Sequence, residues 1–311
     1  MTPNVERVTF TKKKKTVACP VPLAPLADTH AHLLSFWSKE VPETLARAKE
    51  AGIDLLVTVF DPIADKRSVA DYSDWLVREI LPMRDIPQIK YLAGVHPYGA
   101  PDYTDDVHAQ VVAALDDPLC AGIGEIGLDY HYDLSPREDQ RRAFRRQIRL
   151  AHTTGLPAAL HVREAHDEAF AILREEGFPE AGTLLHCFDL DWETLEPWVD
   201  RGCFVALGGA LTFKRCQDTR DAVARTPRNL LLTETDSPYM TPEPMRGMPC
   251  GPAHTVFTAA CMAEVLGCET EKARSQMLAQ IAQNARALLD RPPTAWQIEH
   301  AQTAATERNC E

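Results

Sequence analysis

The sequence predicts an α/β fold, a (β/α)8 TIM barrel that forms a single domain. Three observations lead to this prediction. Short apolar or β-branched runs alternate with longer segments of helical period, eight such runs occur, and 311 residues can hold one barrel of about 250 residues. The expected strands span residues 26–33, 53–60, 89–96, 121–128, 156–162, 182–188, 203–211 and 230–236.

The expected helices lie between these strands, and glycine marks the point where several of them end. Glycine adopts a positive φ without steric penalty, so it commonly follows the last residue of a helix. Clear cases are residues 41–51 before Gly52, 136–154 before Gly155, and 164–176 before Gly177.

The barrel is expected over residues 26–290, because nothing in this range resembles a linker or an internal repeat. Residues 1–25 contain several prolines and no periodicity, which predicts a flexible N-terminal extension. Its lysine run, Lys12 to Lys15, is expected to be a solubilising tail rather than an arm that binds a nucleic-acid strand. The polar residues 291–311 are expected to form a C-terminal tail.

Composition narrows the class of protein. No stretch approaches the roughly 18 apolar residues of a membrane span, and the N-terminus lacks the pattern of a secretory signal. Nine cysteines without any Cys-x-x-Cys argue against a disulfide framework or a zinc ribbon and favour the cytoplasm. A net charge of −12 disfavours a protein that coats nucleic acid, but not an enzyme that meets a strand end. No obligate protein partner is evident.

Histidines and acidic residues occur at or near the C-terminal ends of nearly all the expected strands. In a barrel these ends converge on one face, where active sites of this fold lie. The residues are His30, His32, His96, Glu125, Asp129, His161, His186, Glu234 and Asp236.

The His30-Ala31-His32 segment is typical of a metal site. Side chains at i and i+2 of a strand point the same way, so both histidines can reach one cation. Imidazole and carboxylate together suit divalent ions, and two such ions a few Å apart could share a hydroxide that attacks an ester. Asp236 could take up a proton of that water, or it could act only as a ligand. The residues leave both roles open.

Three further features carry two interpretations each. His96, before a proline, could contact substrate oxygens or cap a loop. Arg163 lies on the same side of its strand as His161 and could bind a phosphate or form a structural salt bridge. The arginines of residues 137–149 resemble a nucleic-acid stripe, but their spacing fits the solvated face of an amphipathic outer helix better.

Seven ordered motifs resemble those of the TatD-type deoxyribonuclease family within the amidohydrolase superfamily. They extend from the first expected strand to the last, so the resemblance covers about residues 28–290. The motifs are Asp28-Thr29-His30-Ala31-His32-Leu33, Gly94-Val95-His96-Pro97, Gly124-Glu125-Ile126-Gly127-Leu128-Asp129-Tyr130, Ser135-Pro136-Arg137-Glu138-Asp139-Gln140, His161-Val162-Arg163-Glu164-Ala165, Leu185-His186-Cys187-Phe188 and Glu234-Thr235-Asp236-Ser237-Pro238-Tyr239.

The resemblance implies a barrel with two divalent metal ions (Zn, Mn, Mg, Co or Ni). One ion would be held by His30, His32, Glu125 and Asp236. The other would be held by His161, His186 and Glu125, which would bridge the two. The implied activity is hydrolysis of phosphodiester bonds in DNA, often from a 3′ end and on single strands.

One loop departs from the family pattern. After the last strand the family typically carries Pro-His-Arg-Gly and then Asn-x-Pro, whereas residues 244–252 read Pro-Met-Arg-Gly-Met-Pro-Cys-Gly-Pro. The histidine and asparagine lie outside the motifs that hold the metal ligands, so their absence concerns the substrate rather than the ligands.

We therefore expect a cytoplasmic, metal-dependent phosphodiesterase that acts on DNA ends. The alternative is a hydrolase of a small ester, lactone, amide or phosphoester that uses the same two metal ions. A third possibility is a barrel that has kept its ligands but serves as a non-catalytic partner in an assembly.

Overall fold

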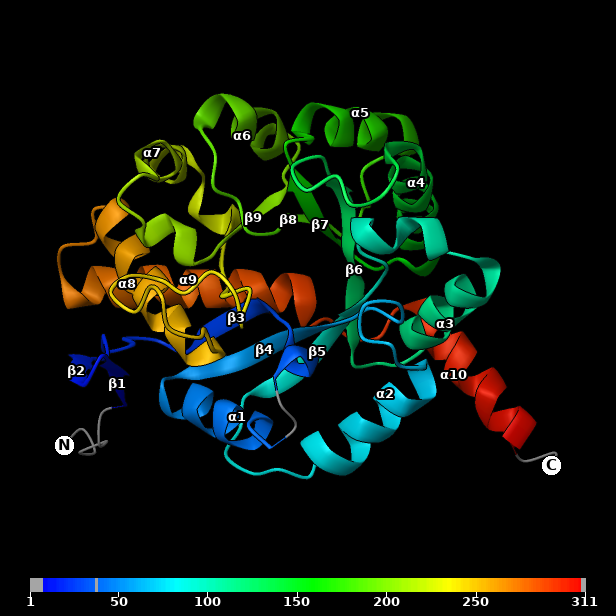
Figure 1. The fold of residues 1–311 in the computed structure, drawn as a ribbon, viewed down its shortest axis with the longest axis horizontal. Helices are drawn as coiled ribbons and strands as arrows, with labels where there is room; N and C mark the ends of the chain where they lie inside the picture. The colour runs from blue at the N-terminus through cyan, green and yellow to red at the C-terminus, as the bar shows by residue number, and fades with distance from the viewer. Residues whose placement is uncertain (1–7, 37–38, 309–311) are drawn as a thin grey trace.

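The computed structural model describes residues 8–36 and 39–308, and the side chains of these residues up to 301. Eight parallel strands form the central sheet, in the order in which they occur along the chain (Figure 1). They are β3 (Leu26–Ala31), β4 (Ile53–Phe60), β5 (Gln88–Ala93), β6 (Cys120–Asp129), β7 (Ala158–Arg163), β8 (Thr183–Leu185), β9 (Phe204–Leu207) and β10 (Leu231–Thr233).

Hydrogen bonds between the first and last barrel strands close the sheet. The Thr233 hydroxyl donates to the Ala27 carbonyl, at 2.7 Å. Beyond β10, the backbone N–H of Asp236 donates to the His30 carbonyl, and that of His32 donates to the Ser237 carbonyl. The predicted (β/α)8 barrel is therefore confirmed.

Helices surround the barrel, most of them between consecutive strands (Figure 1). They are α1 (Val41–Glu50), α2 (Val69–Trp75), α3 (Asp105–Leu115), α4 (Arg137–Thr154), α5 (His166–Glu176), α6 (Trp192–Asp200), α7 (Gln217–Arg225), α8 (Thr255–Val265), α9 (Glu271–Leu289) and α10 (Ala295–Arg308). A π-helical turn, Leu76–Ile80, continues α2. Short 3₁₀ helices include Leu33–Ser35, Pro97–Asp102, Gly209–Thr212, Arg228–Leu230 and Pro252–His254. At the end of α4, Gly155 has a φ of 67°, as its position after a helix predicts.

Two apolar layers hold the barrel together. Small and branched side chains from alternate strand positions fill its interior, and residues from the end of α9 join this cluster. A larger cluster lies between the strands and the outer helices. The β4 sequence, Ile-Asp-Leu-Leu-Val-Thr-Val-Phe, is buried along almost its whole length, as expected for a parallel strand covered on both faces.

The last three strands end earlier than the sequence predicts. Their expected ranges were 182–188, 203–211 and 230–236, but β8, β9 and β10 end at Leu185, Leu207 and Thr233. After β9 the chain turns into a 3₁₀ helix, and after β10 Asp236 has a φ of 58°, which is incompatible with a continued strand. His186 and Asp236 therefore lie just past the paired strands.

The segment before the barrel is folded over part of its length, which differs from the expected flexible extension. Strands β1 (Thr9–Lys12) and β2 (Lys15–Ala18) form an antiparallel hairpin with Lys13 and Lys14 at its turn. Phe10 is buried, and its ring centroid lies 4.7 Å from that of His254 and 5.0 Å from that of Phe257. The lysine run is thus the tip of an anchored hairpin, and Lys12 Nζ donates to the Pro244 carbonyl at 2.5 Å.

Replacing Phe10 with alanine should remove this anchor. We expect the free energy of unfolding to fall by about 3 kcal/mol, because a buried ring is lost and leaves a cavity. Urea unfolding followed by circular dichroism measures the change. Thr11→Ala, on the exposed face of the same strand, is the control and should change stability little; equal effects from both variants would contradict the anchoring role.

The segment after residue 290 also differs from the expected tail. It contains α10, and the side-chain amide of Gln297 is buried against the barrel. That amide donates to the carbonyls of Leu115, Asp117 and Cys120, at 3.0, 3.0 and 3.2 Å. Periodicity did not reveal this helix, because its contacts come from Gln297 and the neighbouring Trp296 rather than from a repeating apolar face.

Candidate metal centre

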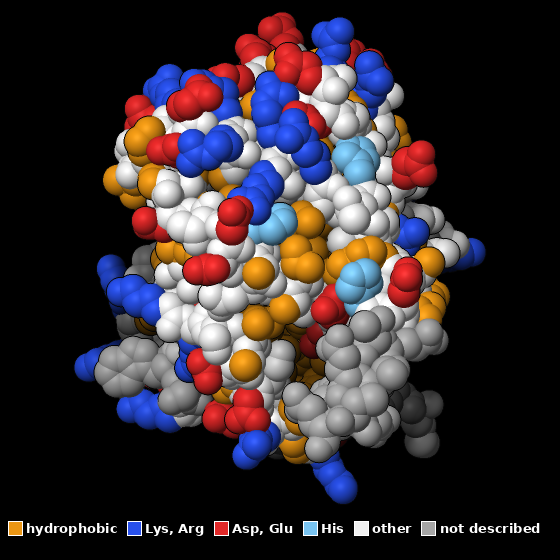
Figure 2. Space-filling model, turned by 90° about the vertical axis from the view of Figure 1, so that its right-hand side faces the viewer, with side chains coloured by type: hydrophobic (Ala, Val, Ile, Leu, Met, Phe, Trp, Pro, Cys, Tyr) orange, Lys and Arg blue, Asp and Glu red, His pale blue; other side chains and the backbone are white. Residues whose placement is uncertain are grey.

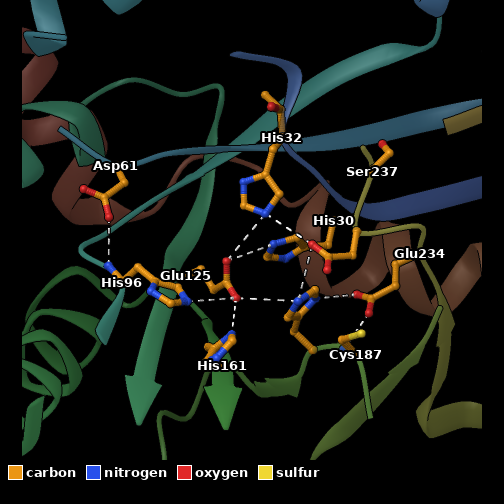
Figure 3. Close-up of polar contacts among 12 residues, drawn as sticks. His30, His32, Asp61, His96, Glu125, His161, Cys187, Glu234 and Ser237 are labelled. Carbon is orange, nitrogen blue, oxygen red and sulfur yellow. Dashed lines mark hydrogen bonds and ion pairs between the residues drawn. The ribbon is translucent and has the colours of Figure 1, made fainter. Parts of the chain in front are cut away.

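The six predicted ligands converge at the C-terminal ends of the barrel strands. Figure 3 labels four of them, His30, His32, Glu125 and His161. His30 belongs to β3, Glu125 to β6 and His161 to β7. The other three follow strand ends: His32 after β3, His186 after β8 and Asp236 after β10.

Glu125 lies between two groups of histidines, and each of its oxygens faces one group. Oε2 is 3.3 Å from His30 Nε2 and 3.7 Å from His32 Nε2. Oε1 is 2.6 Å from His161 Nδ1 and 3.5 Å from His186 Nε2. Burial alone would raise the pKa of Glu125, but His186, His30 and His161 hold it well below its usual range. A carboxylate placed in this way can bridge two cations.

Asp236 approaches the same nitrogen of His32 as Glu125 does. Its Oδ1 is 3.3 Å from His32 Nε2 and 3.8 Å from His186 Nε2. Burial by itself would raise the pKa of Asp236, but the hydrogen bond with His32 and the nearby His186 lower it. The carboxylate is therefore ionised at neutral pH. His186 belongs to the group at Glu125 Oε1, and the same Nε2 also lies 3.8 Å from Asp236 Oδ1.

His30 shows that the cluster fits a cation. Both of its ring nitrogens are buried without a hydrogen-bond partner, although Nε2 lies close to Glu125. Its ring stacks on that of His186, with centroids 3.6 Å apart. Burying an imidazole nitrogen unpaired is costly, and a metal ion bound to Nε2, the nitrogen that faces Glu125, would remove that cost for this atom.

Two carboxylates orient histidines of the centre, a role that their positions in the sequence did not predict. Glu234 Oε2 is 3.0 Å from His186 Nδ1, and Asp129 Oδ2 is 3.0 Å from His161 Nε2. In each ring the nitrogen next to the carboxylate is the one that does not face Glu125. Carboxylates bonded to the far nitrogen fix the ring orientation of metal-binding histidines. For Asp129, the sequence spacing could have predicted this contact, because Asp129 is four residues after Glu125 and therefore on the same strand face.

Replacing Glu234 with glutamine tests this orienting contact. We expect metal affinity to fall about 10–100-fold, because His186 loses the charged partner of its Nδ1. Competition with a chromogenic chelator measures the affinity. Glu196→Gln, on the outer helix α6, is the control, and an unchanged affinity in Glu234→Gln would show that the contact does not orient His186.

Close packing of β6 against β7 also positions the centre. A side chain at Gly127 would place its Cβ only 1.9 Å from the His161 carbonyl oxygen. Glycine at this position therefore allows the strand that carries Glu125 to approach the strand that carries His161. Asp28 of β3 connects that strand to the segment after β10. It accepts hydrogen bonds from the Thr235 hydroxyl and backbone N–H, at 2.6 and 2.9 Å.

His96 caps a loop, which is one of its two predicted roles, and its other ring nitrogen faces the centre. Its Nδ1 accepts a hydrogen bond from the Tyr98 N–H, at 3.2 Å, at the start of the 3₁₀ helix Pro97–Asp102. The proton of the neutral ring must then be on Nε2, which lies 3.8 Å from Glu125 Oε1. Burial and the nearby His161 lower the pKa of His96 to about 3. His96 therefore presents a neutral N–H to the site.

Arg163 is exposed at the end of β7. Its guanidinium lies 4.7 Å from the centre of the Tyr132 ring, a cation–π contact. The ion pairs found among the described side chains do not include Arg163, so the expected alternative of a structural salt bridge is not seen there.

The arginines of α4 are paired with acids rather than free for nucleic acid. Figure 2 shows basic and acidic side chains intermixed over the upper part of this face. Arg141 contacts Glu138 and Glu168, and Arg149 contacts Glu176. These pairs confirm the interpretation of α4 as a solvated outer helix.

The loop that departs from the family pattern packs inward at both altered positions. Met245 stands where the family has histidine, and Cys250 stands where it has asparagine; each is 2% exposed. The Cys250 N–H donates to the Pro238 carbonyl at 3.3 Å, which closes the loop. Both departures therefore change side chains in the interior of the loop. Tyr239, which precedes the loop, lies beside His32 of the metal centre.

Eight parallel strands with a buried cluster of histidines and carboxylates at their C-terminal ends define a metal-dependent hydrolase of the TIM-barrel class. A sequence model of the family described as TatD related DNase matches residues 27–290, and the chain belongs to this family.

Among the described residues, none of the helices combines the length and apolar character needed to cross a membrane.

Several relatives show the same relationship. The chain is 34% identical to the uncharacterized metal-dependent hydrolase YabD of Bacillus subtilis, over 77% of this chain and 91% of YabD. It is 30% identical to a protein named 3′-5′ ssDNA/RNA exonuclease TatD from Erwinia amylovora, over 81% of this chain and 94% of that protein. The crystal structure of YjjV, a TatD homologue from Escherichia coli, superposes with a TM-score of 0.74 and 26% identity, covering 87% of this chain and all of YjjV.

Proposed function

We propose that this hydrolase removes nucleotides from the 3′ ends of DNA strands with the help of two divalent cations. The observation that carries the proposal is the position of Glu125. Its two oxygens face two separate histidine groups, as a carboxylate shared by two metal ions would. Phosphodiester hydrolysis is a common use of paired metal ions.

The donor set divides between two ions around Glu125. We assign His30, His32, Glu125 and Asp236 to one ion and Glu125, His161 and His186 to the other, which is the division that the family resemblance implies and that the contacts of Glu125 support. When bound, such ions lower the pKa of water towards neutrality and neutralise charge that develops on phosphoryl oxygens. Mixed imidazole and carboxylate donors accept Zn, Mn, Co, Ni or Mg, and availability decides which ion is present.

The chain's own groups would then handle protons and position the substrate. Asp236 is ionised and partly exposed, so it can accept a proton from the attacking water. The Nε2–H of His96 can donate to an oxygen of the scissile phosphate. Arg163, held on Tyr132, can bind the phosphate of a neighbouring nucleotide.

Two further observations support a strand end as the substrate. Relatives named 3′-5′ ssDNA/RNA exonucleases align over most of this chain. The net charge of −12 and the paired arginines of α4 leave few basic groups for wrapping a long duplex. Contact with DNA would therefore be local, at the mouth of the barrel.

Metal-loaded protein incubated with 3′- and 5′-labelled single strands tests the proposal. We expect single nucleotides to be released from the 3′ end with at least one of Mg, Mn, Co, Ni or Zn. The same protein is offered a panel of small esters, lactones and amides. Turnover of that panel without nucleotide release under any metal would replace the nuclease with a small-molecule hydrolase.

A further inference from the structure

The exposed tyrosines of this chain gather around the metal centre. Of its seven tyrosines, only Tyr98, Tyr132 and Tyr239 are exposed. Each follows a strand that ends at the site, namely β5, β6 and β10. Exposed aromatic rings that cluster at a site usually serve binding rather than folding.

On one side of the centre, Tyr98 and Tyr132 form a supported pair. Their rings meet edge to face, with centroids 6.2 Å apart. Tyr98 is fixed below by His96, at 4.2 Å between ring centroids, and its hydroxyl donates to Asp129 at 2.9 Å. Tyr132 is 54% exposed and carries the guanidinium of Arg163 against its ring. An aromatic ring and a cation are thus presented together.

On the other side, Tyr239 stands beside the first metal-ligand pair. Its ring centroid lies 6.0 Å from that of His32, edge to face, and 56% of its surface is exposed. The Tyr239 N–H donates to the Asp236 carbonyl, at 2.8 Å, which ties the ring's position to that of Asp236. Tyr239 is therefore next to His32, whereas Tyr132 lies beyond Tyr98, whose ring centroid is 6.4 Å from that of His161. The two most exposed rings are thus near different ligands of the centre.

We propose that Tyr132 and Tyr239 are stacking platforms for unpaired bases on either side of the phosphate that is cleaved, a proposal that rests on the proposed nuclease function. Bases stack on tyrosine whatever their identity, and Arg163 adds a contact for a phosphate. Bases in a duplex are stacked on each other and paired, so they cannot be separated onto two rings without melting. The site therefore selects single-stranded ends.

Four variants and three substrates test this assignment. Tyr132→Ala and Tyr239→Ala remove a ring, whereas Tyr132→Phe and Tyr239→Phe keep it and serve as matched controls. The substrates are a single strand, the same strand with baseless residues at its last three positions, and a blunt duplex. Dissociation constants are measured by fluorescence anisotropy on metal-loaded protein, with strands whose 3′ linkages are phosphorothioates, so that binding is read separately from cleavage.

Each alanine variant should weaken binding of the normal single strand about tenfold, or about 1.4 kcal/mol. Both phenylalanine variants should bind within about twofold of the parent. On the baseless strand, parent and alanine variants should bind alike, and the preference for single strand over duplex should shrink in the alanine variants.

Equal losses on normal and baseless strands would overturn the stacking role, and so would unchanged binding in both alanine variants. A parent protein that releases no nucleotide but shows the ring-dependent binding would refute the nuclease function while leaving the platforms in place. A protein that releases nucleotides but binds strands equally well without either ring would support the nuclease function and refute the platforms.

Discussion

Glu125→Gln should abolish hydrolysis, with kcat/KM falling at least about a thousandfold, and it should leave the purified protein with little bound metal. The amide has no charge to share between two cations, and the two histidine groups that Glu125 faces lose their common partner. Removing one member of a buried charged cluster also leaves the rest uncompensated. Metal analysis and turnover of labelled strands measure both effects.

Glu164→Gln is the matched control for this variant. Glu164 lies three residues after His161, is 64% exposed, and contacts His131 at the rim. It should keep both metal ions and near-parental activity. Circular dichroism of Glu125→Gln should show a folded barrel; a folded variant with full metal content and full activity would refute the two-metal centre.

Asp236→Asn should lower kcat about a hundredfold to ten-thousandfold while the protein still binds both metal ions. The asparagine cannot accept the proton of the attacking water. His30, His32 and Glu125 remain to hold the first ion. Because the pKa of Asp236 is lowered in the folded chain, loss of activity through its protonation should appear only in acid. The activity attributed to this group should therefore not change with pH around neutrality.

The metal content of Asp236→Asn distinguishes the two roles left open by the sequence. If the variant loses one ion and added metal restores its activity, Asp236 is only a ligand. If the ions stay bound and excess metal restores nothing, Asp236 handles the proton. Glu243→Gln, in the loop after Asp236, is the control and should leave both properties unchanged.

Most of the site could be predicted from the positions of histidines and acidic residues along the chain. His30, Glu125 and His161 lie in strands whose apolar runs are clear in the sequence, and parallel strands of a barrel bring their C-terminal ends together. Spacing alone could therefore place these side chains at one face. It could not say which nitrogen or oxygen faces which neighbour, because that depends on strand register and closure.

Other features depended on contacts between distant segments. From the sequence, Glu234 and Asp129 were only acidic residues near strand ends, whereas in the folded chain each contacts a ring nitrogen of a histidine. The N-terminal hairpin looked like a flexible extension because its one anchoring ring, Phe10, packs against His254 and Phe257, almost 250 residues away. A single buried residue leaves no periodic signal.

By itself the sequence determined the barrel, its approximate strands and the set of histidines and carboxylates at their ends, because these follow from local hydrophobic pattern and from the rule that parallel strands end together. The tertiary structure alone decided that Glu125 divides its oxygens between two histidine groups, and that exposed tyrosines lie near them. Those relations join loops from different strands, and only closure of the barrel between β3 and β10 brings such loops within a few Å of each other.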